Sequence, residues 1–372
     1  MVALRPLFRL GLKTAGYRLA RAGLRRPPHP SVLTFSITNR RMACTANEAC
    51  ERGPSDSQNE LTVGEIDRIF RSIGPLFLLS LTGGEPFLRD DVQHVVGLAC
   101  KFLRPALLHI STEGLAPDRV DDGVSKCLAS IERDSPDTLL TVRPVFDGLR
   151  AGSAFELLIE SVDRLRRIAR RDCHLRLDVC ALASRANLDS MAEIEGFAEG
   201  LGVHHFSGAV AAPDTKPGEE SRLRPDECER LMGDLASGAR SRLCGARRLA
   251  RLGAAVRLVY YEYARRIEHE KRQVLPCLAG IANAHLAPQG DLWPCSTLEG
   301  GNPMGNVREA DCNFGAVWRS ARARAARRLI RRGACACPLA EQVYSNIACS
   351  PRALLKVIRI ALFARPHAGG SR

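Results

Sequence analysis

The amino-acid sequence predicts an α/β fold, namely a full or partial barrel followed by a smaller α+β domain. Two observations lead to this prediction. Between Val32 and Leu201, short apolar runs alternate with amphipathic helical stretches, which is the pattern of a parallel sheet wrapped by helices. The total of 372 residues also exceeds what one compact core usually holds. At least five strand-helix units in about 170 residues are typical of an α/β barrel.

Each predicted strand is an apolar run that is followed, in most units, by a helical pattern. In the first unit, Thr62 and Glu65 form a capping box, and an apolar helical stripe follows it. The predicted strands are Val32–Thr38, Phe77–Leu81, Ala106–Thr112, Leu139–Phe146 and Leu175–Ala183, and the further predicted helices are Arg89–Lys101, Phe155–Arg171 and Leu188–Leu201.

The positive charge is concentrated in two segments of the chain. The net charge is +13, and residues 1–30 hold seven Arg or Lys with no acid, whereas residues 319–372 hold twelve against the single Glu341. In the first segment, Arg5, Arg9 and Lys13 recur at helical spacing between leucines. A basic amphipathic helix of this kind suits an anionic membrane surface. The alternative is an arginine-rich composition that has no anionic partner.

Composition also argues against several classes of protein. No charge-free run of 18 apolar residues occurs, so a membrane-spanning helix is not expected. Aromatic residues make up 5% and do not interleave with the basic positions, so we expect no nucleic-acid partner. The 14 cysteines stand in a long chain without a recognisable secretory signal, which favours metal-bound or free thiols in the cytoplasm. We expect the protein to be cytoplasmic. Contact between its basic segments and a membrane surface would make it membrane-associated.

Two predicted strands end in residues suited to binding a ligand. The second strand runs into Thr82-Gly83-Gly84-Glu85-Pro86. Two glycines permit close approach of the backbone, Glu85 can accept hydrogen bonds from an amine, and Pro86 stiffens the exit. The third strand ends in Ser111 and Thr112. For an isolated Gly-Gly pair, a plain tight turn is the alternative explanation.

Three segments together resemble the radical S-adenosylmethionine superfamily. They are Thr38-Asn39-Arg40, Glu60-Leu61-Thr62 and the segment from Leu81 to Arg89 that holds the Gly-Gly-Glu-Pro strand end. The resemblance implies a partial (β/α)6 barrel, a [4Fe-4S] cluster, an electron donor, and reductive cleavage of S-adenosylmethionine to a 5′-deoxyadenosyl radical that abstracts hydrogen. It also implies the residues that bind S-adenosylmethionine. These are Gly83, Gly84 and Glu85, with Pro86, for the methionyl amine, and Ser111 and Thr112 for the ribose and carboxylate.

The loop after the first strand departs from the pattern of this superfamily. Relatives carry three cysteines with three and then two residues between them, whereas this chain has Arg41 at the first position and then only Cys44 and Cys50. A cluster here needs a substitute ligand, or it does not assemble. Two functions therefore stay open: an active enzyme, or a catalytically degenerate protein that keeps an auxiliary site and acts as a binding or scaffold partner. A reading error within residues 41–58 is a third explanation.

A second cysteine pattern lies in the last third of the chain. Cys277 is followed by twelve residues, Gly290, four residues and Cys295, which resembles the opening of a SPASM domain or its shorter form, twitch. The Pro-Gln-Gly-Asp turn predicts a hairpin between Ile281–Ala287 and Leu292–Thr297. Cys335 and Cys337 complete four thiols, which suit one auxiliary [4Fe-4S] cluster or a zinc ion. Four unrelated buried cysteines are the alternative.

One further cysteine is a reserve candidate for this cluster. Glu341 stands where the resemblance leads us to expect another thiol, so Cys349 is the reserve fourth ligand. The remaining cysteines, among them Cys100, Cys127, Cys173 and Cys180, lie in apolar patterns and are expected in the core.

We expect five regions along the chain. They are a basic amphipathic segment (1–30), a barrel (31–225), a helical connection (226–270), a SPASM- or twitch-like domain (271–350) and a basic tail (351–372). A Pro- and Gly-rich loop at 211–225 is expected at the end of the barrel. The substrate stays open among a peptide, a lipid and a small molecule.

Overall fold

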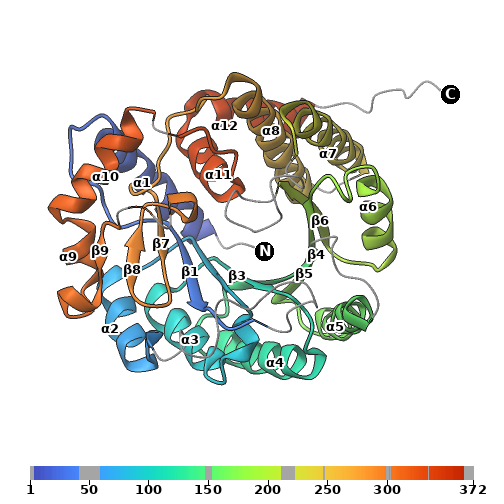
Figure 1. Ribbon diagram of the computed structural model, residues 1–372, viewed down its shortest axis with the longest axis horizontal. Helices are drawn as coiled ribbons and strands as arrows, with labels where there is room; N and C mark the ends of the chain where they lie inside the picture. The colour runs from blue at the N-terminus through green and yellow to red at the C-terminus, as the bar shows by residue number, and fades with distance from the viewer. Residues whose placement is uncertain are drawn as a thin grey trace.

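The computed structural model describes residues 4–41, 59–146, 153–210, 223–245, 248–298, 301, 303–333 and 335–363. The strands are β1 (Val32–Thr38), β2 (Leu78–Gly83), β3 (Leu107–Thr112), β4 (Leu139–Phe146), β5 (Leu175–Ala183), β6 (His205–Val210), β7 (Asn283–Leu286), β8 (Asp291–Trp293) and β9 (Gly305–Asn306). They form one nine-stranded sheet in the order β6-β5-β4-β3-β2-β1-β7-β8-β9 (Figure 1). Strands β1 to β6 pair in sequence order and in parallel. The predicted partial (β/α)6 barrel is thereby confirmed.

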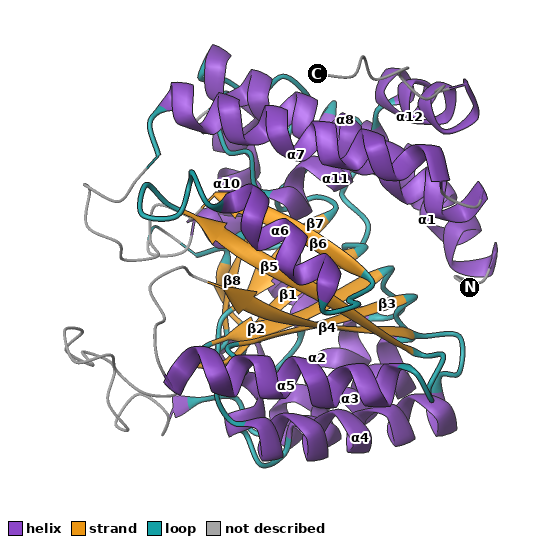
Figure 2. Ribbon diagram, turned by 90° about the vertical axis from the view of Figure 1, so that its right-hand side faces the viewer, coloured by secondary structure: helices purple, strands orange, loops and turns teal. Residues whose placement is uncertain are grey.

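Helices cover both sides of this sheet. They are α1 (Leu4–Arg21), α2 (Val63–Ile73), α3 (Val92–Leu98), α4 (Pro117–Asp134), α5 (Ser153–Ala169), α6 (Met191–Gly200), α7 (Pro225–Gly245), α8 (Arg248–Glu270), α9 (Phe314–Trp318), α10 (Ala321–Arg331), α11 (Ala340–Cys349) and α12 (Pro351–Phe363). Figure 2 shows α2 to α5 on one side of the sheet and α7, α8 and α11 on the other. None of the described helices combines the length and apolar character needed to cross a membrane.

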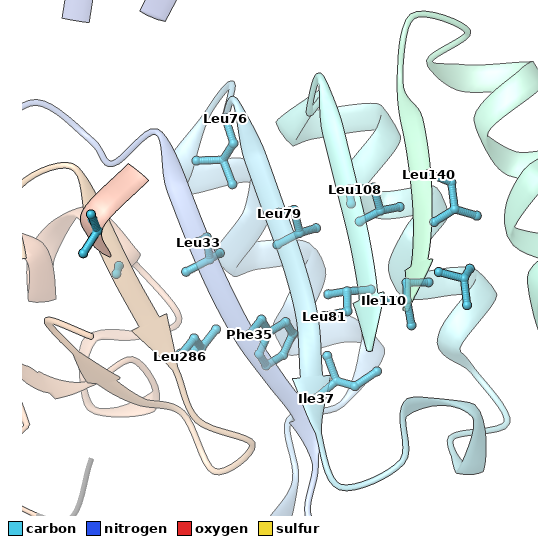
Figure 3. Packing of buried hydrophobic residues seen from close by; sticks show 14 of the residues in the cluster. Leu33, Phe35, Ile37, Leu76, Leu79, Leu81, Leu108, Ile110, Leu140 and Leu286 are labelled. Atoms are coloured by element: carbon cyan, nitrogen blue, oxygen red, sulfur yellow. The ribbon is translucent and has the colours of Figure 1, made fainter. Parts of the chain in front are cut away.

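One face of the sheet is apolar and packs on α2 to α5. Alternate residues of the strands point to the same side (Figure 3), as the two-residue period of a strand requires. On β1 these residues are Leu33, Phe35 and Ile37, all fully buried. Phe35 meets Phe70 of α2 edge to face at 6.2 Å between ring centroids. The apolar run of β1 therefore fixes which side of the sheet receives the helices.

The other face of the sheet carries polar residues on nearly every strand. They lie opposite one another in register and are, in pairs, Thr34 and Ser80, Ser36 and Thr82, Ser80 and His109, Ser111 and Arg143, and Cys180 and Ser207. Helix α11 contacts this polar face, because Thr34 donates a hydrogen bond to Glu341 and Asn283 donates one to Gln342 at 2.7 Å. We call this surface the polar face of the barrel.

The capping box and the hairpin predicted from the sequence are both present. Thr62 N donates to Glu65 at 2.8 Å, and Glu65 N donates to the Thr62 hydroxyl at 3.3 Å. Strand β7 pairs with β8 in antiparallel fashion and with β1 in parallel. The strands of the C-terminal region thus extend the sheet of the barrel, and the predicted division into five regions stays a prediction.

Two expectations about helices were incomplete. Helix α4 was not foreseen at all. The segment interpreted as a basic tail begins with helix α12, whose Ala353 and Val357 are buried. The apolar residues of this segment recur at helical spacing, which predicts a helix. The interpretation as a basic tail considered only the charges and therefore missed it.

Candidate functional site

The Gly-Gly pair at the end of β2 lies against the segment that follows β1. Gly84 N donates to Thr38 O at 2.8 Å, and Glu85 N donates to Arg40 O at 2.7 Å. A Cβ atom on Gly83 would lie 2.3 Å from Thr38 O, and one on Gly84 would lie 1.9 Å from Arg40 O. Gly83 also has a φ of +119°, which disfavours any side chain. The glycines therefore permit close approach of a neighbouring backbone segment, where the sequence interpretation invoked a ligand.

Glu60 fixes the end of β1 from the opposite side. Its carboxylate accepts hydrogen bonds from the Thr38 hydroxyl at 2.7 Å and from Asn39 N at 2.8 Å. Arg89 lies 3.9 Å from the second carboxylate oxygen and donates to Ile37 O at 2.7 Å. Both side chains are buried, so each charge has a partner where water is excluded. The sequence motifs that contain Glu60 and Arg89 did not predict this role for either residue.

Glu85 is buried and makes three hydrogen bonds within the protein. Only 1% of its surface is exposed. It accepts from Thr112 Oγ1 at 2.8 Å, from Glu113 N at 2.6 Å and from Phe87 N at 3.1 Å. Burial raises the pKa of Glu85 to about 7, although these hydrogen bonds act in the opposite direction. A carboxylate offers about four acceptor positions, so capacity for one further donor remains.

The candidate residues of β3 lie beside this carboxylate. Thr112 is buried and donates a hydrogen bond to Glu85. Ser111 is half-buried on the polar face, opposite Arg143 of β4. Pro86 is buried and begins a short 3₁₀ turn. All six positions predicted to bind the cofactor therefore lie at the carboxyl ends of β2 and β3, where parallel barrels bind ligands.

Cys44 and Cys50 lie outside the described residues. The described ends of their segment lie close together, because Asn39 N donates to Glu60 at 2.8 Å and Arg40 O accepts from Glu85 N at 2.7 Å. The described residues on either side of 42–58, Arg40 and Glu60, therefore lie near the Gly-Gly-Glu strand end.

Charged residues on the polar face form a network that the sequence analysis missed. Arg143 Nη2 lies 3.6 Å from Asp178 Oδ2, and Arg257 of α8 also interacts electrostatically with Asp178. Within the part of the chain that the structure describes, the buried Nε atoms of Arg143 and Arg257 have no hydrogen-bond partner. Burial lowers the pKa of the neighbouring His109 to about 3, so its ring is neutral. Two guanidinium groups against one carboxylate leave donors for an additional anionic group. The sequence signal that could have revealed this network is the presence of charged residues, Arg143 and Asp178, inside predicted strands.

Four cysteines come together in the C-terminal region. Cys277 and Cys295 belong to one small buried cluster with Ala279 and Ile330, and Cys335 and Cys337 interact electrostatically with both. Burial raises the pKa of Cys277 to about 11 and that of Cys295 to about 12. These thiols are protonated at neutral pH, so binding of a metal would release protons.

Four thiols suit one [4Fe-4S] cluster or a single zinc ion. Zinc with four thiolate ligands at about 2.3 Å brings the sulfurs within about 4 Å of one another. Among the described residues, a group of three potential ligand atoms within 4.8 Å occurs only at Asp172, Cys173 and His174. No three of the four cysteine sulfurs therefore lie within 4.8 Å of one another.

Two predictions about single cysteines need correction. Cys349, the reserve ligand, packs in a separate cluster with Tyr17 and Leu278, because α11 directs it toward α1. Cys173 is exposed and not part of the core, since it lies in the turn between α5 and β5. Cys100, Cys127 and Cys180 are buried, as predicted.

Comparisons with known proteins support this description. Residues 277–338 match the family model of the SPASM domain, an iron-sulfur cluster-binding domain. SuiB of Streptococcus suis bound to S-adenosylmethionine is similar in structure, with a TM-score of 0.54 and 15% identity over 82% of this chain and 68% of that chain. SuiB bound to the precursor peptide SuiA has a TM-score of 0.51 and 14% identity over 82% of this chain and 69% of that chain. The native anSMEcpe with bound AdoMet and Cp18Cys peptide has a TM-score of 0.55 and 11% identity over 90% of this chain and 99% of that chain.

No curated protein sequence matches the chain. At these identities, the structural similarity shows the fold alone. The resemblance to the radical S-adenosylmethionine superfamily is confirmed at the level of the fold, and a SPASM-type iron-sulfur domain follows the barrel.

Proposed function

We propose that the protein is a radical S-adenosylmethionine-type iron-sulfur protein with two sites. S-adenosylmethionine would bind at the carboxyl ends of β1 to β4, and a [4Fe-4S] cluster would bind to Cys277, Cys295, Cys335 and Cys337. The single observation that supports this proposal best is the joining of the Gly83-Gly84-Glu85 strand end to Thr38–Arg40, with both segments fixed by buried hydrogen bonds.

The reaction proposed is reductive cleavage of S-adenosylmethionine to a 5′-deoxyadenosyl radical, for which an electron donor is required. The contribution of the chain is to bind and orient the cofactor. Glu85 retains capacity for one donor, and an ammonium group beside it would favour its ionised form. Arg143 supplies donors for a carboxylate. Thr112 and Glu113 N hold the Glu85 side chain at 2.8 and 2.6 Å.

A second candidate function is a binding or scaffold role without catalysis. The observation that favours it is Arg41, which stands where relatives have the first of three cysteines and leaves only Cys44 and Cys50. In that case the C-terminal thiols hold the one cluster of the protein. Four thiols suit a single auxiliary cluster, which corresponds to the shorter twitch form.

A peptide is the substrate class we propose first. Two of the similar structures contain peptides, namely SuiA and Cp18Cys. The polar face, with Arg143 and Asp178, offers hydrogen-bond partners to a peptide. A lipid and a small molecule are the alternatives. We extend the proposal to a cytoplasmic location with peripheral contact between the basic segments and a membrane surface.

Iron counting after anaerobic reconstitution tests these proposals. About eight irons per chain indicate two clusters, and about four indicate the C-terminal cluster alone. With reductant and S-adenosylmethionine, the enzyme would release 5′-deoxyadenosine. Full iron loading without this product would overturn the catalytic proposal and support the scaffold role.

A further inference from the structure

Helix α12 exposes an apolar surface instead of burying it. Its buried residues are Ala353 and Val357, and Lys356 forms an ion pair with Glu262 of α8. Its large apolar residues Leu355, Ile358, Leu362 and Phe363 are exposed. The first three recur at intervals of three and four residues, so they form a stripe on the solvent side of the helix.

Helix α1 exposes a similar stripe. Leu12 and Leu19 are exposed, and they lie two turns apart on the same side of the helix. Arg18 Nε donates to Cys349 O at 2.7 Å, two residues before α12 begins. Figure 2 shows α1 and α12 on the same side of the molecule. The two helices that carry the stripes therefore lie on the same side of the molecule.

The charge of both helices has a single sign. Neither Leu4–Arg21 nor Pro351–Phe363 contains an acidic residue. Exposed arginines flank the stripes, namely Arg18, Arg352 and Arg359. A second copy of the chain would place two cationic surfaces against each other, which repel. An anionic bilayer surface offers both an apolar phase and complementary charge.

We infer that this surface docks on an anionic membrane. We call it the α1–α12 surface and define it by Leu12, Leu19, Leu355, Ile358, Leu362 and Phe363 with Arg18, Arg352 and Arg359. The inference rests on the membrane contact proposed above and is independent of the proposed reaction. It assigns that contact to apolar residues as well as to charge.

The location of α1 fixes which end of the barrel meets the membrane. Lys13 Nζ donates to Pro75 O at 2.9 Å and to Pro30 O at 3.4 Å, and both acceptors precede the starts of strands. The Gly-Gly-Glu site lies at the opposite, carboxyl ends. Since β1 has 7 residues, the two ends are roughly 20 Å apart. The docked protein therefore turns its cofactor site toward the aqueous phase.

Co-sedimentation of the full chain with vesicles tests the inference. We expect binding to vesicles rich in phosphatidylglycerol and little to vesicles of phosphatidylcholine alone. Leu362→Gln removes an apolar contact without changing charge, and it should weaken binding about tenfold. Leu329→Gln on α10 is the matched control, because Leu329 is 58% exposed against 66% for Leu362. Arg352→Gln with Arg359→Gln should weaken binding about fivefold per arginine.

Three results would overturn the inference. The first is equal binding to both kinds of vesicle. The second is equal weakening by Leu362→Gln and Leu329→Gln. The third is a dimer in sedimentation equilibrium that Leu362→Gln dissociates, since a second copy would then cover the surface. Because release of 5′-deoxyadenosine is measured without vesicles, failure here is distinguishable from failure of the proposed reaction.

Discussion

The Gly-Gly-Glu strand end and the four-cysteine cluster differ in what holds their residues in place. At the strand end, Thr38, Glu60 and Glu85 are fixed by hydrogen bonds within the protein. In the cysteine cluster, Cys277 and Cys295 are protonated thiols in an apolar environment. The first site is therefore preorganised by the fold. The second gains its bonds only when metal replaces the protons.

The largest effect is expected at the cysteine cluster. Cys295→Ser removes one of four ligands, so the reconstituted protein should lose about four irons per chain. The measurement is iron and sulfide content after anaerobic reconstitution. Cys349→Ser is the matched control, because Cys349 is also buried but lies in another cluster. Equal iron loss in both variants would contradict the assignment.

The next effect tests the preorganised site. Gly84→Ala places a Cβ atom 1.9 Å from Arg40 O, so the strand end must move apart. We expect the free energy of unfolding to fall by about 3 kcal/mol, as for strong overpacking. Urea titration measures this change. Gly64→Ala is the control, since no atom outside its chain neighbours and the backbone of its own helix lies within 4 Å of its Cβ position; a comparable loss there would argue against a specific contact.

Glu85 should make stability depend on pH. Burial raises its pKa from 4.5 to about 7, so the folded state binds a proton that the unfolded state has released between these values. The contribution of Glu85 to the free energy of unfolding should therefore fall as the pH rises from 4.5 to about 7. Above that pH the contribution should stay constant, because the carboxyl is then ionised in both states. Thermal melts across this range measure it. The slope should diminish in Glu85→Gln; an unchanged slope would assign it to other groups.

The smallest expected effect concerns the contact between the barrel and the C-terminal region that follows it. Arg308 donates to both carboxylate oxygens of Glu65, at 2.6 and 3.0 Å, and to Glu60 O at 3.0 Å. Arg308→Lys keeps the charge but loses the bidentate geometry, so we expect a loss of about 1 kcal/mol in unfolding free energy. Chemical denaturation measures it. A loss of several kcal/mol in unfolding free energy would contradict this expectation. It would show that the barrel and the C-terminal region stabilise each other far more strongly than one bidentate contact does.

Local patterns explain which parts of the fold were predictable. The run Val32–Thr38 and the pair Thr62 and Glu65 determine a strand and a capped helix from residues close in sequence. The roles of Glu60 and Arg89 were not predictable, because their contacts with Ile37–Asn39 depend on how distant segments meet.

The same limit applies to the candidate sites. The spacing of Cys277 and Cys295 predicted their proximity, since one hairpin joins them. That Cys349 lies apart from the four-cysteine cluster could not be predicted, because it depends on how α11 packs against α1. The network of Arg143, Asp178 and Arg257 also depends on how α8 packs over the sheet, which no local pattern encodes.

The most direct test of two separate sites is binding of labelled S-adenosylmethionine, measured by equilibrium dialysis with anaerobically reconstituted protein. We predict that Cys295→Ser binds S-adenosylmethionine like the unaltered protein, whereas Gly84→Ala loses binding. Retained binding in Gly84→Ala, or loss of binding in Cys295→Ser, would contradict the assignment of the cofactor to the preorganised strand end.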